Sequence, residues 1–293
     1  MYSYKDLTII IPSTVNNINS KFVNQINSYS SLGIKIIISI TPNISINEVY
    51  KKGFESSIKI IKSEEKGQVK QRQYAYKFCK TCLIMHMDDD MLMSIRSLKK
   101  LIREFCSLKN NACLAPRINN TNKVRKDFIL QTIKNIILFL DFNPKPGSVS
   151  KTSFPVQHKK EKGNYDDFQK VDWLPGGLLI IKKKDIILNN YYQFKGKAYC
   201  EDLIHSFLLQ EKGIDLYVSN NCFCQTTLYP YKNQKPVNFL NFILNDFNAR
   251  NYFRKLSNKP LIPMAIVYIF LILNYFFFKL KNLFKILYKI LKI

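Results

Sequence analysis

The fold of this 293-residue chain is constrained most by a series of short, continuous apolar runs rich in β-branched residues. The two longest are Leu7–Pro12 (LTIIIP) and Ile34–Ile40 (IKIIISI), and shorter runs follow at Ile58–Ile61 and Cys82–Met87. Such runs are typical of strands in a parallel sheet, because a strand that is buried on both faces has no solvent side that would require polar residues.

Segments with helical spacing separate these runs. In the first of them, Phe22, Ile26 and Tyr29 recur every three or four residues. The expected helices are Asn19–Leu32, Gly67–Cys79, Ser97–Leu108 and Tyr199–Gly213. Val171–Ile181 predicts a turn that feeds a strand, and Asp215–Val218 a further short strand. Alternating strands and helices with short connections predict an α/β fold with a doubly wound sheet.

Ligands bind to doubly wound sheets at the carboxyl ends of the strands. Pro12 and Ser13 end the first predicted strand, and Asp88–Asp90 follow the strand at Cys82–Met87. We therefore expect these residues to share one edge of the sheet. The segment Phe142–Lys170 is polar, with three prolines and two glycines. It predicts a long loop, and loops of this length inside a domain are usually functional or mobile.

Charge narrows the classes of partner. The chain has 45 Lys and Arg against 21 Asp and Glu, a net charge of +24. This favours nucleic acid, an anionic membrane surface or phosphate-bearing substrates. The lysines are spread along the chain and crowd its apolar C-terminus, without aromatic residues interleaved among them on one sheet face. We therefore expect no nucleic-acid partner, and a basic nucleic-acid-binding protein stays an alternative.

Cysteine use indicates a reducing compartment. The seven cysteines are scattered, and the N-terminus leads directly into a strand without a secretory signal, so we expect reduced cytosolic thiols. Cys79 and Cys82 have the spacing of a redox or zinc knuckle, but the second half of a zinc site is missing. Cys222 and Cys224 show the alternation of a strand. We interpret these cysteines as structural.

Three adjacent aspartates, Asp88–Asp90, follow the apolar run CLIM in the stretch HMDDDM. In an extended segment, residues two apart project to the same side, so Asp88 and Asp90 are expected to face one object while Asp89 faces away. Converging carboxylates suit Mg²⁺ or Mn²⁺, which bind through one or two carboxylates plus substrate phosphates. The alternative is a solvated acidic turn or a helix N-cap.

A second acidic site, Glu201–Asp202, opens the helix expected at Tyr199–Gly213. The helix dipole alone would favour acids there. The functional alternative is a general base, which must be an ionised carboxylate within reach of a substrate hydroxyl. Arg72, in GQVKQRQYA, could pair with an aspartate or with a nucleotide phosphate, and so could Arg250 and Asn251, in NARNYFRK.

The C-terminus differs from the rest of the chain. Leu261–Phe278 contains no charged residue over 18 positions, roughly 27 Å as a helix and close to the lower limit for crossing a bilayer. It is followed by KLKNLFKILYKILKI, the pattern of a basic amphipathic helix suited to an anionic leaflet. We favour an in-plane or re-entrant anchor on the cytoplasmic face over a single span at 261–278. A buried core helix is the remaining alternative.

An ordered set of motifs carries a resemblance to a known family. They are LTIIIPS, KGQVKQRQYA, CLIMHMDDDM, VDWLPGGLLIIKK, CEDLIHSFLLQEKG and NARNYFRK. In this order they resemble family-2 glycosyltransferases with the GT-A fold, over about Leu7 to Lys255. The resemblance implies a Rossmann-like, doubly wound mixed sheet at 1–258, with the membrane-associating segment at 259–293.

The resemblance also assigns residues. Asp88 and Asp90 resemble the metal-binding DxD pair, with Asp90 the direct ligand of Mg²⁺ or Mn²⁺ and Asp88 near the nucleotide ribose. Asp202 resembles the base that deprotonates the acceptor hydroxyl, with Glu201 beside it. The implied nucleotide-sugar-binding residues are Pro12, Ser13, Arg72, Asp88, Asp89, Arg250 and Asn251. The implied acceptor and sugar site consists of Trp173, Gly176 and Gly177.

These roles imply a metal-dependent, inverting glycosyltransferase. It would move a sugar from a nucleotide-diphosphate donor to a glycan or lipid-linked acceptor in surface polysaccharide or lipooligosaccharide synthesis. The family commonly has an acidic residue after the second strand that helps to read the nucleobase, and this chain has SITPN there. His205 could reach the metal or acceptor, but a packed or solvated histidine is the more common case.

Two other classes remain as alternatives at this stage. A catalytically silent GT-A scaffold would share the fold, although intact Asp88, Asp90 and Asp202 argue against it. A nucleotidyltransferase would normally show a glycine-rich phosphate loop after the first strand, and PSTVNNINS contains no glycine.

Overall fold

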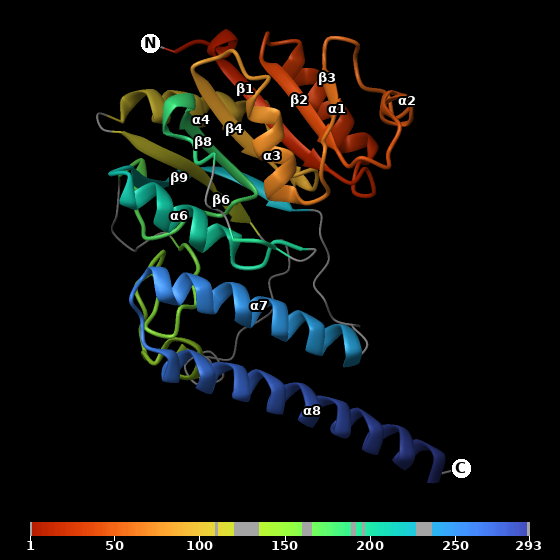
Figure 1. Ribbon diagram of the computed structural model, residues 1–293, viewed down its shortest axis with the longest axis vertical. Coiled ribbons are helices and arrows are strands. Elements are labelled where there is room, and N and C mark those ends of the chain that lie inside the picture. Colours follow the sequence, from red (N-terminus) through yellow and green to blue (C-terminus); the bar gives the residue numbers. More distant parts are fainter. Residues whose placement is uncertain are drawn as a thin grey trace.

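The computed structural model describes residues 2–108, 111–119, 135–159, 166–188, 192–194, 197–226 and 236–291. Within these residues, nine strands form one mixed sheet (Figure 1). The strands are β1 (Leu7–Ser13), β2 (Lys35–Ile40), β3 (Lys59–Lys62), β4 (Leu83–Met87), β5 (Met91–Leu92), β6 (Ala112–Asn119), β7 (Phe168–Lys170), β8 (Leu178–Lys182) and β9 (Asp215–Thr226).

The sheet has a parallel half and a mixed half. Its order is β3-β2-β1-β4-β8-β6-β9-β5, and β7 also pairs with β9. The first four strands are parallel, so their carboxyl ends meet at one edge. Strand β8 then runs antiparallel to both β4 and β6. The buried runs predicted at Leu7–Pro12 and Ile34–Ile40 are central here, because strands covered on both faces need apolar residues at every position.

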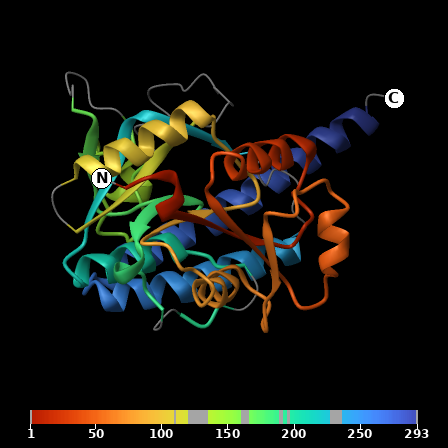
Figure 2. The ribbon, with the colours of Figure 1, turned by 90° about the horizontal axis from the view of Figure 1, so that it is seen from above.

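Helices cover both faces of the sheet, as the doubly wound prediction requires. The helices are α1 (Ser20–Ser30), α2 (Ile46–Tyr50), α3 (Gln68–Tyr76), α4 (Ile95–Ser107), α6 (Glu201–Glu211), α7 (Pro236–Leu256) and α8 (Leu261–Leu291). Figure 2 shows α1 and α4 on one side of the sheet and α3 and α6 on the other. Ile9 and Ile11 pack in the core beneath α1 and α4, whereas Ile10 packs in the core beneath α3 and α6.

Part of the predicted organisation needs correction. Residues Phe168–Lys170, expected to end a long loop, form β7 on β9. Residues 142–159 are irregular, with an isolated bridge between Val149 and Pro155, and residues 160–165 of the predicted loop lie outside the described residues. The strand expected at Asp215–Val218 continues to Thr226 as β9. Strand β6 was not predicted.

Helices α7 and α8 form the end of the molecule farthest from β3 (Figure 1). They pack through aromatic residues, with the rings of Phe239 and Tyr275 stacked at a centroid distance of 3.7 Å. Among the residues that the structure describes, no helix combines the length and apolar character that crossing a bilayer requires. The possible span at 261–278 is therefore unsupported. A helix that is buried all round does not fit either, because Ile262 is 74% exposed.

Candidate functional site

A cavity of about 1150 Å³ opens at the carboxyl edge of the parallel strands. Pro12 and Ser13 line it from the end of β1, and Asp88–Asp90 line it from the end of β4. The prediction that these two segments share one edge is confirmed. Glu201 and Asp202 line the same cavity from the start of α6. The two acidic segments, more than a hundred positions apart in sequence, therefore meet in one cavity.

The three aspartates bond to three different sets of partners. Asp88 Oδ1 accepts hydrogen bonds from Gln68 at 2.7 Å and from Arg72 at 2.6 Å. Asp89 accepts from Ser13 Oγ at 2.6 Å and from Asn17 at 3.1 Å. The expectation that Asp89 faces away is wrong, since Asp89 also lines the cavity. The chain is not extended here: it turns after β4, and the amide of Met91 donates to the Asp88 carbonyl at 3.1 Å.

Asp90 occupies the far end of this turn, beside β9. Its Oδ2 accepts a hydrogen bond from Thr226 Oγ1 at 2.8 Å, and its side chain is almost fully buried. Burial raises the pKa of Asp90, the Thr226 hydrogen bond opposes this, and Asp88 and Asp89 raise the pKa further by repulsion. Burial likewise raises the pKa of Asp89. A bound cation would relieve both penalties, because it favours the charged carboxylates.

Arg72 joins the two acidic segments beneath the cavity. Its guanidinium donates to Glu201 Oε1 at 2.7 Å, to Asp88 Oδ1 at 2.6 Å and to the Gly176 carbonyl at 3.0 Å. Burial disfavours the charged guanidinium, but Glu201 and Asp88 together raise its pKa. Of the two roles predicted for Arg72, the hydrogen bonds support pairing with an aspartate, Asp88.

Glu201 and Asp202 form the first turn of α6. Cys200, immediately before them, has a left-handed backbone with φ 58°. Burial raises the pKa of Asp202, and the neighbouring Glu201 raises it further. Arg72 and a backbone hydrogen bond from Gly176 oppose this rise. Asp202 is consequently a more basic carboxylate than one in water, and a general base works best when its pKa lies near the working pH.

Gly176 and Gly177 separate the two acidic segments. A Cβ atom on Gly176 would lie 2.6 Å from Asp202 Oδ1, and one on Gly177 would lie 2.4 Å from the Met91 side chain and 3.2 Å from Asp88 Oδ2. A glycine pair is needed because backbone passes directly against both sets of carboxylates. The loop Pro175–Gly177 thus lies between Asp88 and the Glu201–Asp202 pair, and Gly177 also lines the cavity.

Trp173 lines the cavity near this loop. Its indole N–H donates to the Val156 carbonyl at 3.1 Å, and its ring lies 4.3 Å from the ring of His158. Trp173 is therefore fixed before any ligand arrives. An aromatic ring held in this way can pack against the apolar face of a sugar.

Arg250 and Asn251, predicted to lie near a diphosphate, differ in their position relative to the cavity. Arg250 lines the cavity, but its guanidinium donates to Asp246, to the Tyr268 hydroxyl at 3.0 Å and to the Ser153 carbonyl at 2.9 Å. These bonds tie α7 to α8. Asn251 lies outside the cavity and accepts from Arg254. The sequence did indicate the ion pair, because Asp246 and Arg250 are four residues apart and so lie on one face of a helix.

Several cavity residues escaped the sequence analysis. Lys197 lines the cavity, where burial lowers its pKa and attraction to Asp90, Asp88 and Asp202 opposes that change. Its distance in sequence from Asp88 and Asp90 left no local signal for that contact, although Asp202 lies only five residues after it. Gln68 had one, because it lies four residues before Arg72 and so shares a helix face with it.

His205 does not belong to the cavity lining. It is buried, its ring lies 5.6 Å from that of His86, and burial lowers its pKa to about 3. It is therefore a neutral packed histidine, which agrees with the more common of the two expectations.

The donor set fits a divalent cation that the substrate helps to hold. Among the described residues, no three His, Cys, Asp or Glu groups form a complete metal site of their own. Mg²⁺ and Mn²⁺ commonly take one or two carboxylates and complete their shell with phosphates and water. Asp90, buried in the cavity wall with a raised pKa, has the chemistry for the first contribution.

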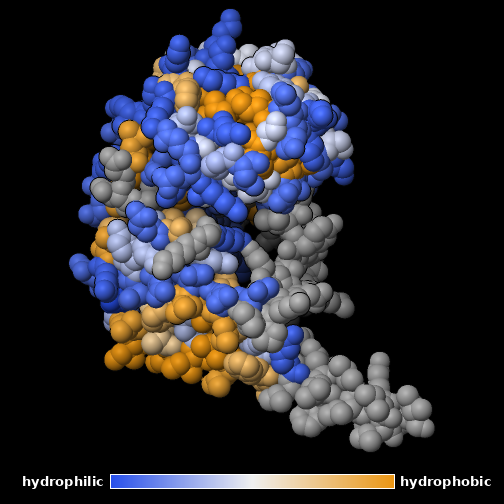
Figure 3. Space-filling view, turned by 45° about the vertical axis from the view of Figure 1, so that its right-hand side comes forward, coloured by the Kyte–Doolittle hydropathy of each residue, from blue (hydrophilic) through white to orange (hydrophobic). Residues whose placement is uncertain are grey.

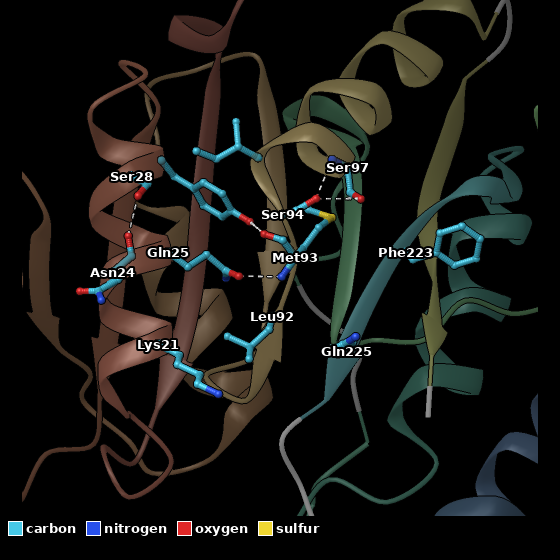
Figure 4. A pocket seen from close by; sticks show the side chains of 12 residues that line it. Lys21, Asn24, Gln25, Ser28, Leu92, Met93, Ser94, Ser97, Phe223 and Gln225 are labelled. Atoms are coloured by element: carbon cyan, nitrogen blue, oxygen red, sulfur yellow. Dashed lines mark hydrogen bonds between the residues drawn. The ribbon is translucent and has the colours of Figure 1, made fainter. Parts of the chain in front are cut away.

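A second cavity, of about 590 Å³, lies behind β5 on the side of α1 and α4 (Figure 4). There the Gln25 amide group donates to the Met91 carbonyl at 3.2 Å and accepts from the Met93 amide at 2.6 Å. The Tyr29 hydroxyl also donates to the Met93 carbonyl. Helix α1 thereby fixes the backbone that directly follows the aspartates.

Comparison with known proteins identifies the class of fold. No model of a known protein family matches the sequence, and no curated protein matches it. Many solved structures share the fold. Their likeness defines a GT-A type of mixed α/β fold, the fold of nucleotide-sugar-dependent glycosyltransferases, and at these low identities it establishes the fold alone.

Three of these structures illustrate the likeness. GalNAc-T7, solved with UDP, GalNAc and Mn²⁺, is 12% identical with a TM-score of 0.52 over 77% of this chain, which spans only 44% of that protein. Glucosyl-3-phosphoglycerate synthase from Mycobacterium tuberculosis, with phosphoglyceric acid, is 10% identical with a TM-score of 0.50, covering 87% and 80% of the two chains. A mycobacterial protein is 8% identical with a TM-score of 0.50, covering 87% and 75%.

Proposed function

We propose that this protein is a metal-dependent, inverting glycosyltransferase of family-2 type. It transfers a sugar from a nucleotide-diphosphate donor to a hydroxyl of a glycan or lipid-linked acceptor, in surface polysaccharide or lipooligosaccharide synthesis at the cytoplasmic face of the membrane. The observation that carries the proposal is the meeting of Asp88–Asp90 and Glu201–Asp202 across Gly176 and Gly177 in one cavity.

The donor side of the cavity is the β1–β4 edge. Asp90, with Asp88 beside it, would hold Mg²⁺ or Mn²⁺, and the bound cation would neutralise charge that develops on the leaving diphosphate. Lys197 adds a second positive charge on the same wall. Ser13 and Asn17 hold Asp89 in the part of the cavity at the end of β1, where polar groups suit a ribose or base.

The acceptor side is the start of α6. Asp202 removes the proton from the acceptor hydroxyl while the hydroxyl oxygen attacks the anomeric carbon. At the same time, the bond from that carbon to the diphosphate oxygen breaks. Attack from the face opposite to the leaving group inverts the configuration. The raised pKa of Asp202 supports this role, and Trp173 provides a fixed ring for the sugar.

The test is turnover of a panel of UDP-, GDP- and dTDP-sugars, read as release of the nucleoside diphosphate with Mn²⁺ present. Asp202→Asn should reduce turnover by about 10²- to 10⁴-fold, the usual contribution of a general base, and leave donor affinity nearly unchanged. Glu211→Gln, on the exposed far end of the same helix, is the matched control and should retain turnover.

Three results would contradict the proposal. Turnover by Asp202→Asn equal to that of the control would remove Asp202 as the base. Binding of a donor without any turnover, with acceptors of several chemical classes, would indicate a catalytically silent scaffold. An anomeric configuration retained in the product would contradict single displacement.

A further inference from the structure

Helix α8 has one face packed against the protein and one face without a partner among the described residues. Met264, Val267 and Tyr268 are buried. The opposite side carries the exposed α8 face, defined by five apolar residues that are each at least half exposed. They are Ile262, Ile266, Ile269, Leu273 and Phe277. Their spacing of three or four residues places them along one stripe of the helix.

The neighbouring helix α7 also carries exposed apolar residues. Leu240 and Leu244, four residues apart on α7, are 46% and 59% exposed. Figure 3 shows hydrophobic residues gathered at the end of the molecule where α7 and α8 lie, whereas the opposite end is mostly hydrophilic with smaller apolar areas. Folded soluble proteins rarely expose a contiguous apolar surface of this kind unless it binds a partner or a membrane.

The positive charge of α8 indicates what kind of partner the exposed α8 face binds. Lys279 is exposed just beyond the last described apolar residue of the stripe. In the sequence, Lys281, Lys285 and Lys289 follow within the same helix, and positions 261–293 contain no Asp or Glu. A second copy of the chain would bring two such lysine-rich segments together, at a cost in repulsion. An anionic bilayer provides both a matching negative charge and an apolar layer.

We propose that the exposed α8 face is a membrane-binding surface, with α8 lying parallel to an anionic bilayer and its apolar stripe at the boundary between headgroups and acyl chains. The surface of an anionic bilayer attracts each nearby lysine, and salt weakens this attraction by screening it. The inference is independent of the catalytic proposal, because it depends on α7 and α8 alone.

The first test is flotation of the full chain with vesicles of phosphatidylcholine, with and without about one third phosphatidylglycerol. Ile269→Glu with Leu273→Glu should lower binding to the anionic vesicles by at least about 10-fold, and about 0.5 M salt should weaken binding of the unaltered chain by screening. Ile46→Glu, on exposed α2 at the other end of the molecule, is the matched control and should bind normally. Thermal unfolding confirms that each variant is folded.

The second test measures orientation. Single Trp residues replace Ile262 and Phe277, which lie roughly 22 Å apart along the helix axis, and quenching by brominated lipids reports their depth. Trp173 is buried in the cavity wall and provides the background. Equal, shallow depths are expected for a helix in the plane of the membrane. Depths that differ by most of the axial separation would overturn the in-plane orientation.

Two outcomes overturn the proposal as a whole. One is equal binding of the Ile269→Glu/Leu273→Glu variant and the control to anionic vesicles. The other is a dimer in ultracentrifugation that this variant breaks, with no vesicle binding by the unaltered chain, which would make the face an interface between copies. Asp90→Asn should bind vesicles normally, so failure of the catalytic proposal would be seen separately.

Discussion

Asp202 lies beside Glu201 in the first turn of α6, and burial raises its pKa in the folded state. The unfolded value is near 3.9. Between these two values the folded chain binds more protons than the unfolded chain, so this group lowers stability progressively as pH rises through the window. Above the folded pKa the penalty is complete, because every folded molecule then carries the charge of this partly buried carboxylate.

Asp202→Asn should therefore stabilise the protein, and the gain relative to the unaltered chain should grow from about pH 5 to about pH 8. The amide has no charge to bury, whereas the carboxylate does. Urea unfolding of both proteins at the two pH values measures the difference. A difference that is constant with pH would contradict the raised pKa, and the same variant should be the inactive one in turnover assays.

Removal of Arg72 should destabilise the protein, in contrast to Asp202→Asn, because it leaves acids without their partner. The Arg72 side chain is 3% exposed and pairs with Glu201 and Asp88. Arg72→Met should cost about 3–5 kcal/mol, the usual result of breaking a buried ion pair by removing one partner. Arg72→Met with Glu201→Gln should lose clearly less than the sum of the two single changes, since the residues are in contact. Additive losses in urea unfolding would contradict the bridge.

At the scale of elements, the loop before β8 places the two acidic segments against each other. Gly176→Ala would put a methyl group 2.6 Å from Asp202 Oδ1 and 2.8 Å from Glu201 Oε2. The carboxylates must move, so we expect a large loss of turnover with a small loss of stability. Gly213→Ala is the control, because Gly213 has φ 72° and no atom near the added Cβ.

Gly213→Ala should cost about 1–2 kcal/mol of stability through its left-handed backbone and leave turnover intact. Thermal unfolding and turnover, measured on both variants, separate the two effects. Equal losses of turnover in the two proteins would contradict the close approach at Gly176.

Helix α1 has a comparable positioning role for β5. Gln25 makes two hydrogen bonds to the backbone of Met91 and Met93, on the edge of β5 opposite to β9. Gln25→Ala should weaken metal-dependent donor binding several-fold, because the turn that carries Asp90 loses one of its supports. Ser28→Ala, one turn along the same helix, removes only a bond within α1 and should bind normally. Calorimetry of both variants provides the comparison.

The elements differ in how far sequence could predict them. Strands β1 and β2 were predictable because burial on both faces requires unbroken apolar runs. Strand β6 was missed since Pro116 and Arg117 interrupt its pattern, and Arg117 is instead satisfied by Asn220 and the Ser219 carbonyl of β9. Strand β7 is three residues long, too short for any periodicity to appear.

Sequence could likewise predict some residues of the candidate site and not others. Asp88–Asp90 and Glu201–Asp202 were predictable because acids are scarce in this chain and these follow or begin regular elements. Their partners Thr226 and Asn17 were not, since sheet order brings them together from distant positions. Arg250 lines the cavity as well as pairing with Asp246, and only the pair was readable as a local signal, since Asp246 lies one turn earlier in the helix.

At the scale of the whole molecule, the cavity and the exposed α8 face lie close to one another. Arg250 lines the cavity from α7 and donates to Tyr268 on the buried side of α8. Only the thickness of two helices therefore separates the acidic cavity from the proposed membrane surface. A lipid-linked acceptor fits this arrangement, because its glycan could enter the cavity while its lipid stays in the bilayer.

The chain carries a net charge of +24, but the charged residues that line this cavity are mainly acidic. Among the residues that the structure describes, five carboxylates line the cavity, together with Lys66, Lys197 and the paired Arg250. A nucleotide diphosphate would be repelled by these acids unless a cation binds with it. The proposed reaction therefore requires a metal ion and a donor that bind together.

The most direct test is calorimetric titration of the protein with UDP-, GDP- and dTDP-sugars, with and without Mn²⁺, in parallel with Asp90→Asn. We expect one class of nucleotide sugar to bind, only with Mn²⁺ present, and Asp90→Asn to abolish this binding while the protein stays folded. Failure of every donor to bind, with or without metal, or equal binding by Asp90→Asn, would contradict this expectation.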